Sequence, residues 1–203
     1  MEKSSHRETS HKLAILVSKF ISPPIFAIMA TIAFSLWSPI GLGLLQPSWS
    51  ILICFSLFAF FPFLPVFYFY KKNIVDLDIS KREMRTPFFV IAAIFYSIAA
   101  TIFFITNTEI MFLLASSYAL VTIILLLVNR VWKVSVHSAG VTGPTFALIF
   151  VFGLMALPLS LLIVLVSWSR IKLKKHTFTQ TFVGSLIPIA VGLMLYPAFL
   201  PMI

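Results

Sequence analysis

The sequence is poor in charge. Charged residues make up 10% of its 203 residues, whereas hydrophobic residues make up 60%. Soluble domains carry about 25% charged and about 45–50% apolar residues, so a soluble globular domain is excluded. Apolar stretches long enough to cross a bilayer recur along the chain, and they are continuous rather than alternating, which excludes a β-barrel. The composition predicts an all-α membrane protein.

Cysteine is also scarce. Cys54 is the one cysteine, so no disulfide can form within the chain, and we expect it to be a small buried hydrophobic residue. The formal net charge is +9, which in a soluble protein would suggest a nucleic-acid partner. In a membrane protein, topology explains such an excess first, and no nucleic-acid partner is expected.

Seven apolar segments are present, separated by polar or very short connectors. They are Pro24–Leu45, Trp49–Tyr70, Pro87–Thr106, Glu109–Asn129, Ser138–Phe152, Leu154–Trp168 and Phe178–Phe199. Three connectors, 71–86, 130–137 and 169–177, are rich in Lys and Arg and are called the basic connectors below. No linker is recognisable, so the chain 1–203 is expected to form a single integral membrane domain.

The first twelve residues, MEKSSHRETSHK, are predicted to form a short polar and basic tail, 1–12, before an apolar run that starts at Leu13. A cleaved signal peptide is the competing interpretation. The apolar region continues to about Leu45 without a small-residue cleavage pattern. We therefore expect a retained first span, broken or started at Pro23 and Pro24.

The stretch 141–168 has two possible structures. One helix of 28 residues would be about 42 Å long, which exceeds the roughly 30 Å hydrocarbon core. Two helices of about 15 residues would each be short, at about 22 Å. Gly153 and Pro158 are the places where the stretch can break.

The distribution of charge favours the two-helix structure. With seven spans, the N-terminus and the three basic connectors share one face and hold all fifteen Lys and Arg residues, whereas the other face has only Glu109. A single long helix would move Arg170 and three lysines to that other face. The positive-inside rule therefore predicts seven spans in the cell membrane, with six still possible. It also predicts that the basic face is cytoplasmic and that Ile203 lies outside the cytoplasm.

The basic connectors carry the residues best suited to chemistry. They are Arg82, Arg85, Lys133, Ser135, His137, Arg170 and His176. Guanidinium groups form bidentate hydrogen bonds to phosphate oxygens, and histidine acts as a proton carrier or a nucleophile. Metal-assisted chemistry would need several carboxylate ligands. This face is poor in them, so phosphoryl transfer without a metal or other cofactor is predicted.

The few carboxylates on this face are assigned a structural role. Asp78 and Glu83 are expected to pair with Lys81, Arg82 or Arg85 and hold them in position. The lysines of the third connector, Lys172, Lys174 and Lys175, are expected to form an interfacial cluster that touches anionic lipids.

The third connector resembles a known motif. Ser169 and Arg170, then IKLKK, then His176 are similar to the Ser-Arg-x5-His element of the phosphatidic acid phosphatase type 2 superfamily. The sequence SVHS, 135–138, resembles the Ser-Gly-His element of that family, with Val136 in place of glycine. In the first connector, REMRTP resembles the Lys-x6-Arg-Pro element only loosely. Pro87 is displaced by one residue there, and Asp78 stands at the lysine position.

The resemblance, from about Asp76 to Gly184, implies a metal-independent phosphatase acting through a phosphohistidine. By position, His176 would attack phosphorus and His137 would protonate the leaving oxygen. Phosphate oxygens would be bound by Arg170, Arg85 and Ser135. Arg82 and Lys133 are further phosphate-binding candidates, on charge and position alone. Such groups would stabilise the charge that develops on the transferring phosphoryl group.

Gln180 departs from the family, which usually has an aspartate four positions after the nucleophile. Its oxygen can accept a hydrogen bond from the His176 ring, but it carries no charge to stabilise an imidazolium. This predicts slower turnover or a more reactive substrate, such as a diphosphate.

The expected function is therefore hydrolysis of a phosphate monoester or diphosphate on a lipid, such as phosphatidate or a polyprenyl phosphate. Two alternatives remain open. One is a non-catalytic binder or transporter of anionic lipids on the same scaffold. The other is a phosphotransferase that passes the phosphoryl group to an acceptor other than water. Membrane lipids are the expected surroundings, and the sequence names no protein partner.

Overall fold

The computed structural model describes the backbone of residues 2–200 and the side chains of residues 8–200. Every regular element in this part is helical. Five helices are long and apolar enough to cross a membrane, and a bent pair at the N-terminus raises the number to six. The prediction of an all-α protein with several such helices is confirmed. Ile203, whose side of the membrane was predicted, lies outside the described residues.

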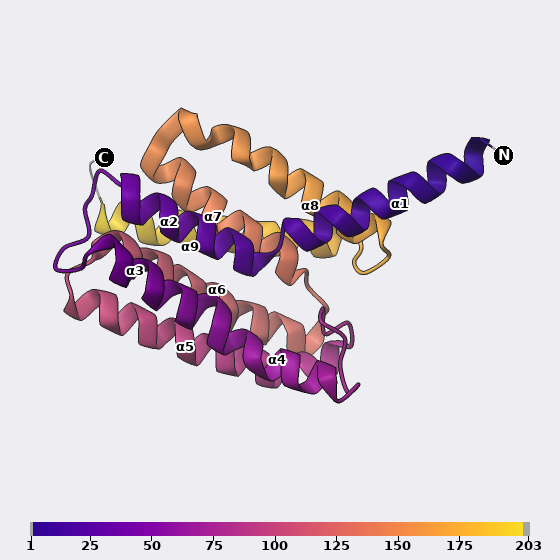
Figure 1. Ribbon diagram of the computed structural model, residues 1–203, viewed down its shortest axis with the longest axis horizontal. Coiled ribbons are helices and arrows are strands. Elements are labelled where there is room, and N and C mark those ends of the chain that lie inside the picture. Colours follow the sequence, from indigo (N-terminus) through magenta and orange to yellow (C-terminus); the bar gives the residue numbers. More distant parts are fainter. Residues whose placement is uncertain (1, 201–203) are drawn as a thin grey trace.

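Figure 1 shows elongated helices running side by side along the long axis, with α1 projecting beyond one end of the bundle. The elements in chain order are α1 (Glu2–Phe20), α2 (Pro23–Trp37), α3 (Pro47–Cys54), the π-helical η1 (Phe55–Phe60), α4 (Phe61–Lys71), the 3-10 helix η2 (Arg82–Arg85), α5 (Thr86–Ile105), α6 (Glu109–Val131), α7 (Val136–Phe152), the 3-10 helix η3 (Gly153–Leu159), α8 (Ser160–Lys172) and α9 (Phe178–Phe199).

The N-terminal segment is helical, where a polar tail was expected. From Glu2 onward the predicted tail 1–12 belongs to α1, and an ion pair of 2.7 Å between Glu8 and Lys12, one turn apart, supports the helix. The break predicted at Pro23 and Pro24 is present as a bend of 49° between α1 and α2. Proline is favoured at the first helical positions, so a new helix starts there.

The second apolar segment is helical throughout but not uniformly α-helical. A π-helical turn, η1, separates α3 from α4 and lies just before Pro62 and Pro65. Proline has no N–H, and its ring clashes with the carbonyl four residues earlier. A wider turn accommodates this mismatch without ending the helix.

The stretch 141–168 folds back on itself. The hydroxyl oxygens of Ser138 and Ser167 lie 3.3 Å apart, although 29 residues separate them. In one straight helix they would be about 43 Å apart. The reversal occurs at Gly153, which has a positive φ of 64°. By hydropathy Val136–Lys172 is a single apolar stretch of 37 residues, but its two helices are antiparallel neighbours.

The predicted boundaries of this pair are partly wrong. The second helix, α8, begins at Ser160 rather than Leu154 because η3 forms the turn, and it continues to Lys172. Arg170 therefore lies in the last turn of a helix and not in a connector. With 17 and 13 residues, α7 and α8 are each shorter than the roughly 20 residues that usually cross a bilayer.

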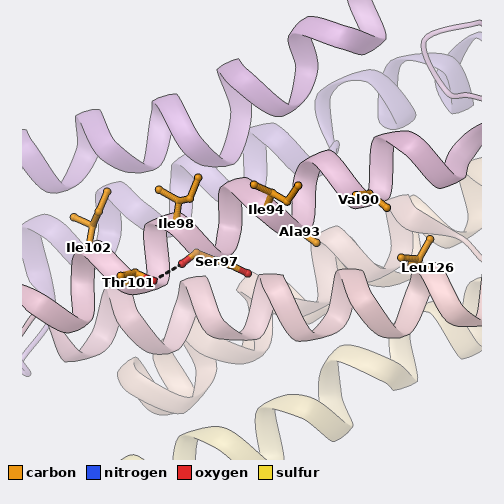
Figure 2. A pocket seen from close by; sticks show the side chains of 8 residues that line it. All are labelled: Val90, Ala93, Ile94, Ser97, Ile98, Thr101, Ile102 and Leu126. Atoms are coloured by element: carbon orange, nitrogen blue, oxygen red, sulfur yellow. Dashed lines mark hydrogen bonds between the residues drawn. The ribbon is translucent and has the colours of Figure 1, made fainter.

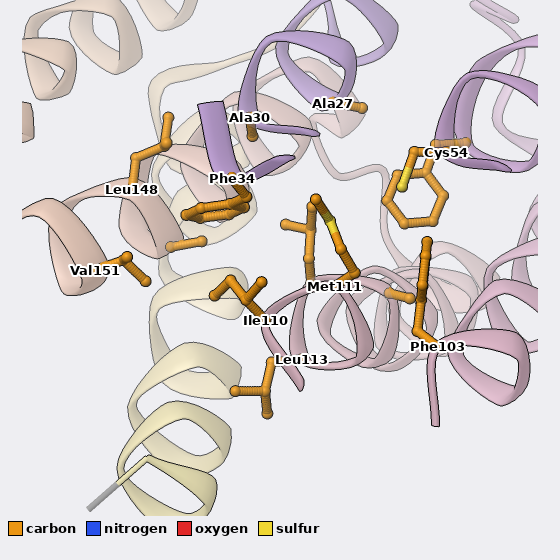
Figure 3. Packing of buried hydrophobic residues seen from close by; sticks show 14 of the residues in the cluster. Ala27, Ala30, Phe34, Cys54, Phe103, Ile110, Met111, Leu113, Leu148 and Val151 are labelled. Atoms are coloured by element: carbon orange, nitrogen blue, oxygen red, sulfur yellow. The ribbon is translucent and has the colours of Figure 1, made fainter. Parts of the chain in front are cut away.

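The main apolar core fills the half of the bundle where α6 begins and α7 ends. Phe34, Phe103, Ile110 and Met111 are buried there and come from α2, α5 and α6 (Figure 3). Cys54 is 1% exposed in the same cluster, as predicted. A smaller cluster of Phe89, Val121, Leu125, Val134, Ala139 and Val191 packs nearer the other end. The chain therefore concentrates its apolar packing away from the basic connectors.

Candidate active site

The three basic connectors meet at one end of the bundle. The Arg85 side chain donates to the Val134 carbonyl oxygen at 2.9 Å, which joins the first connector to the second. The Arg170 guanidinium, in the last turn of α8, donates to the Asp78 carboxylate at 3.0 Å, which joins the end of α8, where the chain enters the third connector, to the first connector. These contacts bring cations from segments almost 100 residues apart into one cluster.

Arg170 is the most deeply buried of these cations. Its side chain is 2% exposed. One terminal nitrogen donates to the Ser18 hydroxyl at 2.7 Å and the other to Asp78. The Nε atom is buried without a hydrogen-bond partner among the described residues. A buried guanidinium with an unused donor can accept a further anionic partner.

Arg85 is also buried, at 4% exposure. It lies at the end of η2, where the chain turns into α5. Its hydrogen bonds go to the carbonyl oxygens of Ile79, at 2.8 Å, and of Val134. Both acceptors are neutral, so they position the charge without cancelling it.

His176 is brought next to Arg170 by the way α8 ends. Lys174 adopts a left-handed φ of 55°, and the amides of Lys175 and His176 donate to the Arg170 carbonyl oxygen at 3.0 and 3.3 Å. The Lys175 bond and a bond of 2.9 Å from the Lys174 amide to the Ile171 carbonyl oxygen together form a Schellman motif, with lysine where glycine is usual. The chain therefore reverses over the helix end, and the His176 side chain is buried there.

The surroundings of His176 keep its ring neutral. Burial, followed by the positive charges of Arg85 and Arg170, lowers the pKa of His176 to about 3. Lys133 acts in the same direction, and the hydrogen bond with Gln180 acts against it. A neutral imidazole is the form that can act as a nucleophile.

Gln180 fixes which ring nitrogen is free. It is the third residue of α9 and forms a capping box with Thr177. Its Oε1 accepts from the Thr177 amide at 3.2 Å and lies 3.1 Å from Nδ1 of His176. Since Oε1 can only accept, Nδ1 must carry the hydrogen, and Nε2 then carries the lone pair. The hydrogen bond expected from the sequence is present, without the charge of an aspartate.

The second connector is held against the first two turns of α9. Ser135 caps α7, accepting from the Ser138 amide at 3.2 Å, and its own amide donates to the Gln180 carbonyl oxygen at 3.1 Å. Gly184 permits this approach, because a Cβ there would lie 2.6 Å from the Ser135 carbonyl oxygen. His137 follows in the first turn of α7, and its Nε2 lies 3.8 Å from Asp78.

Lys133 and Arg82, the two further phosphate-binding candidates from the sequence, differ in their position relative to the cluster. Lys133 is half-buried near the cluster, and burial together with the charges of Arg85, Lys175 and Arg170 lowers its pKa. Arg82 instead donates to the carbonyl oxygens of Asn129, at 3.2 Å, and Arg130, at 2.7 Å. Its guanidinium is used at the end of α6, and the structure does not bring it to the cluster.

Sequence reasoning missed three partners in the cluster. Asp78 pairs with Arg170 rather than with its neighbours in sequence, and Lys175, expected in an interfacial cluster, contacts Asp76 at 3.2 Å. Ser18 reaches Arg170 from α1. Burial would raise the pKa of Asp78, but Arg170, His137 and Lys175 outweigh it and lower that pKa. These partners are far apart in sequence, so no local pattern identifies them.

Two hollows lie elsewhere. A groove of about 540 Å³ runs along the outer face of α5, where Ala93, Ser97 and Thr101 lie between larger apolar side chains (Figure 2). A cavity of about 60 Å³ lies inside the bundle and is lined in part by Val136 and Ala139 of α7. Neither is lined by a charged residue. In the described part of the chain, no group of three or more His, Cys, Asp or Glu residues could hold a metal ion.

Comparisons with family models, with curated proteins and with solved structures found no match to this chain.

Proposed function

We propose that this protein is an integral membrane phosphatase that removes a phosphate group from a lipid through a phosphohistidine at His176. The observation that carries the proposal is the pair of buried guanidinium groups, Arg85 and Arg170, beside a buried neutral histidine. Burying a charge is costly unless an anion is paired with it. Arg85 has only neutral acceptors and Arg170 has an unused donor, so the cluster is suited to an additional anion.

The arrangement supports a two-step displacement. Nε2 of His176 attacks phosphorus, the bond from phosphorus to the lipid oxygen breaks, and the imidazolium form of His137 donates a proton to that oxygen and becomes neutral. Water then attacks the phosphohistidine, His137 accepts a proton from it, and inorganic phosphate leaves. Arg85 and Arg170 stabilise the phosphate oxygens in both steps, with Lys133 adding positive charge.

Ser135 contributes in a more limited way than its hydroxyl suggests. The side chain caps α7, so its main effect is to orient the first turn that carries His137. The N-terminal end of α7 also favours an anion through the helix dipole.

The proposed membrane arrangement has seven spans on a core similar to that of the phosphatidic acid phosphatase type 2 superfamily. The bent pair α1–α2 forms one span, and the antiparallel α7 and α8 form two. The positive-inside rule then puts the basic connectors at the cytoplasmic face of the cell membrane. A site at headgroup depth favours an amphiphilic phosphate monoester or diphosphate, which can enter sideways from the bilayer.

A second candidate is a non-catalytic binder of anionic lipids. It is favoured by Gln180, which holds the His176 ring without stabilising a positive charge on it. A phosphotransferase would use the same first step and differ only in its acceptor.

The test is inorganic phosphate release by the purified protein in lipid nanodiscs, with phosphatidate, a polyprenyl phosphate and a polyprenyl diphosphate as substrates. We expect release from at least one of them and a loss of about 10³-fold or more for His176→Ala. Glu109→Gln, at an exposed position at the far end of α6, is the control and should match the wild type. Equal rates from wild type and His176→Ala would end the hydrolase proposal.

A further inference from the structure

Asp78 lies among the cations of the proposed phosphate site. Its carboxylate lies 3.0 Å from Arg170, 3.8 Å from His137 and 3.9 Å from Lys175. Two of these three residues belong to the proposed phosphate-binding and catalytic set. The carboxylate is therefore an anion already bound at the centre of an anion site.

The rest of the short loop 76–80 also makes contacts with the cations. Lys175 donates to Asp76 at 3.2 Å and to the Ser80 hydroxyl at 2.9 Å. The Ile79 carbonyl oxygen accepts from Arg85. One loop thus provides acceptors for three different cations, as a bound phosphate or diphosphate would.

We propose that Asp78 is an internal competitor that a substrate phosphate must displace from Arg170, so that this residue determines the affinity of the site for anions. The inference rests on the proposed function, because it assumes that the cluster binds phosphate. The Nε of Arg170 is unused, but a phosphate bound there would share one guanidinium with the Asp78 carboxylate, and two anions so close repel each other.

The difference in burial indicates which partner moves. The Arg170 side chain is 2% exposed and is also held by Ser18, whereas the Asp78 side chain is 27% exposed. The carboxylate can therefore rotate into water while the guanidinium stays in place. Ile79, the next residue, has a left-handed φ of 45°, which is unfavourable for a β-branched side chain.

Competition of this kind has a distinctive consequence. Every anion must break the same contact between Asp78 and Arg170 before it binds. Removing the Asp78 carboxylate therefore tightens the binding of all anions by the same factor. We expect about tenfold, since hydrogen bonds between charged groups are worth about that much or more. For turnover, KM should fall by the same factor while kcat stays within about twofold, because Asp78 has left Arg170 before the chemical step.

The experiment is calorimetric titration of the detergent-purified protein with inorganic phosphate and separately with vanadate. The variants are Asp78→Asn, which keeps the shape and an acceptor, and Asp78→Ala. Asp76→Asn is the matched control, because it removes the same charge from the same loop without touching Arg170. We expect both Asp78 variants to bind each anion about tenfold more tightly than wild type, and Asp76→Asn to change affinity less than about threefold.

Two outcomes overturn the proposal. Unchanged or weaker anion binding in both Asp78 variants, with wild-type melting temperatures, would show that Asp78 supports the site instead of competing for it. An equal gain in anion affinity from Asp76→Asn would show that any lost negative charge in the loop has this effect, whether or not it contacts Arg170. The proposed function fails differently: wild type would then bind phosphate without releasing it from any lipid, or no variant would bind it at all.

Discussion

The connectors at the two ends of the helix bundle are held together by different kinds of contact. At the far end, the connectors 38–46 and 106–108 contain no charged residue. They are held by neutral contacts, such as the Thr108 hydroxyl with the Leu42 carbonyl oxygen at 2.9 Å. At the basic end, similar connections are made by buried arginines and a buried histidine. Closing the bundle does not need buried charge, so we propose that the buried charges at the basic end serve to bind an anionic ligand.

The largest expected effect comes from removing a central cation. Arg170→Gln should lower kcat/KM for phosphate release by about 10³-fold, because the guanidinium faces the developing charge. Arg82→Gln removes the same charge from the same end of the bundle. Since Arg82 binds carbonyl oxygens of α6, it should lower kcat/KM less than about tenfold. Similar losses in the two variants would contradict the division between them.

The two ends of the bundle can be compared directly, because each has a glycine packed against a backbone carbonyl oxygen. A Cβ at Gly184 would lie 2.6 Å from the Ser135 carbonyl oxygen, and one at Gly43 would lie 2.0 Å from the Asn107 carbonyl oxygen. Both Gly184→Ala and Gly43→Ala should lower the free energy of unfolding by about 1–3 kcal/mol, measured by thermal or denaturant melting.

Only the first of these variants should affect the site. Gly184→Ala separates α9 from the cap of α7, so we expect phosphate to bind about tenfold more weakly, whereas Gly43→Ala should leave its affinity unchanged. Weaker phosphate binding by Gly43→Ala would show that the two ends are coupled.

Gln180→Asp supplies the charge that this site lacks. An aspartate can accept the same hydrogen bond from His176 and also stabilise the imidazolium, so we expect about a tenfold gain in kcat. Gln180→Leu removes the acceptor and should lower kcat. A loss of activity in both variants would mean that the neutral amide is itself required.

The smallest expected effect is the pH dependence that His176 gives to the stability of the folded protein. Burial and the nearby arginines lower its pKa to about 3, so in the folded protein the ring stays neutral between pH 7 and 5. The unfolded chain takes up the proton near pH 6.5, so this contribution to stability is complete above that pH and is lost as the pH falls toward 3. Nitrogen-15 NMR of labelled histidine, assigned with His176→Asn, measures this. Titration of His176 near pH 6.5 would mean that the ring is neither buried nor close to the cations.

The sequence predicts much of the architecture for physical reasons. Hydropathy and the distribution of Lys and Arg identify the helical segments, the return of the chain near Gly153 and the shared face of the basic connectors. Hydropathy cannot show that the N-terminal tail is helical, because that depends on neighbouring side chains such as Glu8 and Lys12.

The site was predictable only where motifs are local. Arg170, His176 and Gln180 lie within eleven residues, and their contacts follow from how α8 ends and α9 begins. The pairing of Asp78 with Arg170 spans 92 residues, and the use of Arg82 at the end of α6 spans 47 or more. Such contacts depend on tertiary packing, so charge alone made Arg82 a phosphate-binding candidate and paired Asp78 with its neighbours in sequence.

The measurement that tests the central claim most directly is trapping of a phosphorylated histidine. The protein in nanodiscs is mixed with a lipid phosphate labelled in its phosphate group, quenched rapidly at alkaline pH and digested for mass spectrometry. We predict an acid-labile phosphate on His176, absent from His176→Ala and unaffected by Glu109→Gln. Phosphate release without any label on His176, or phosphate binding without release or label, would contradict the account.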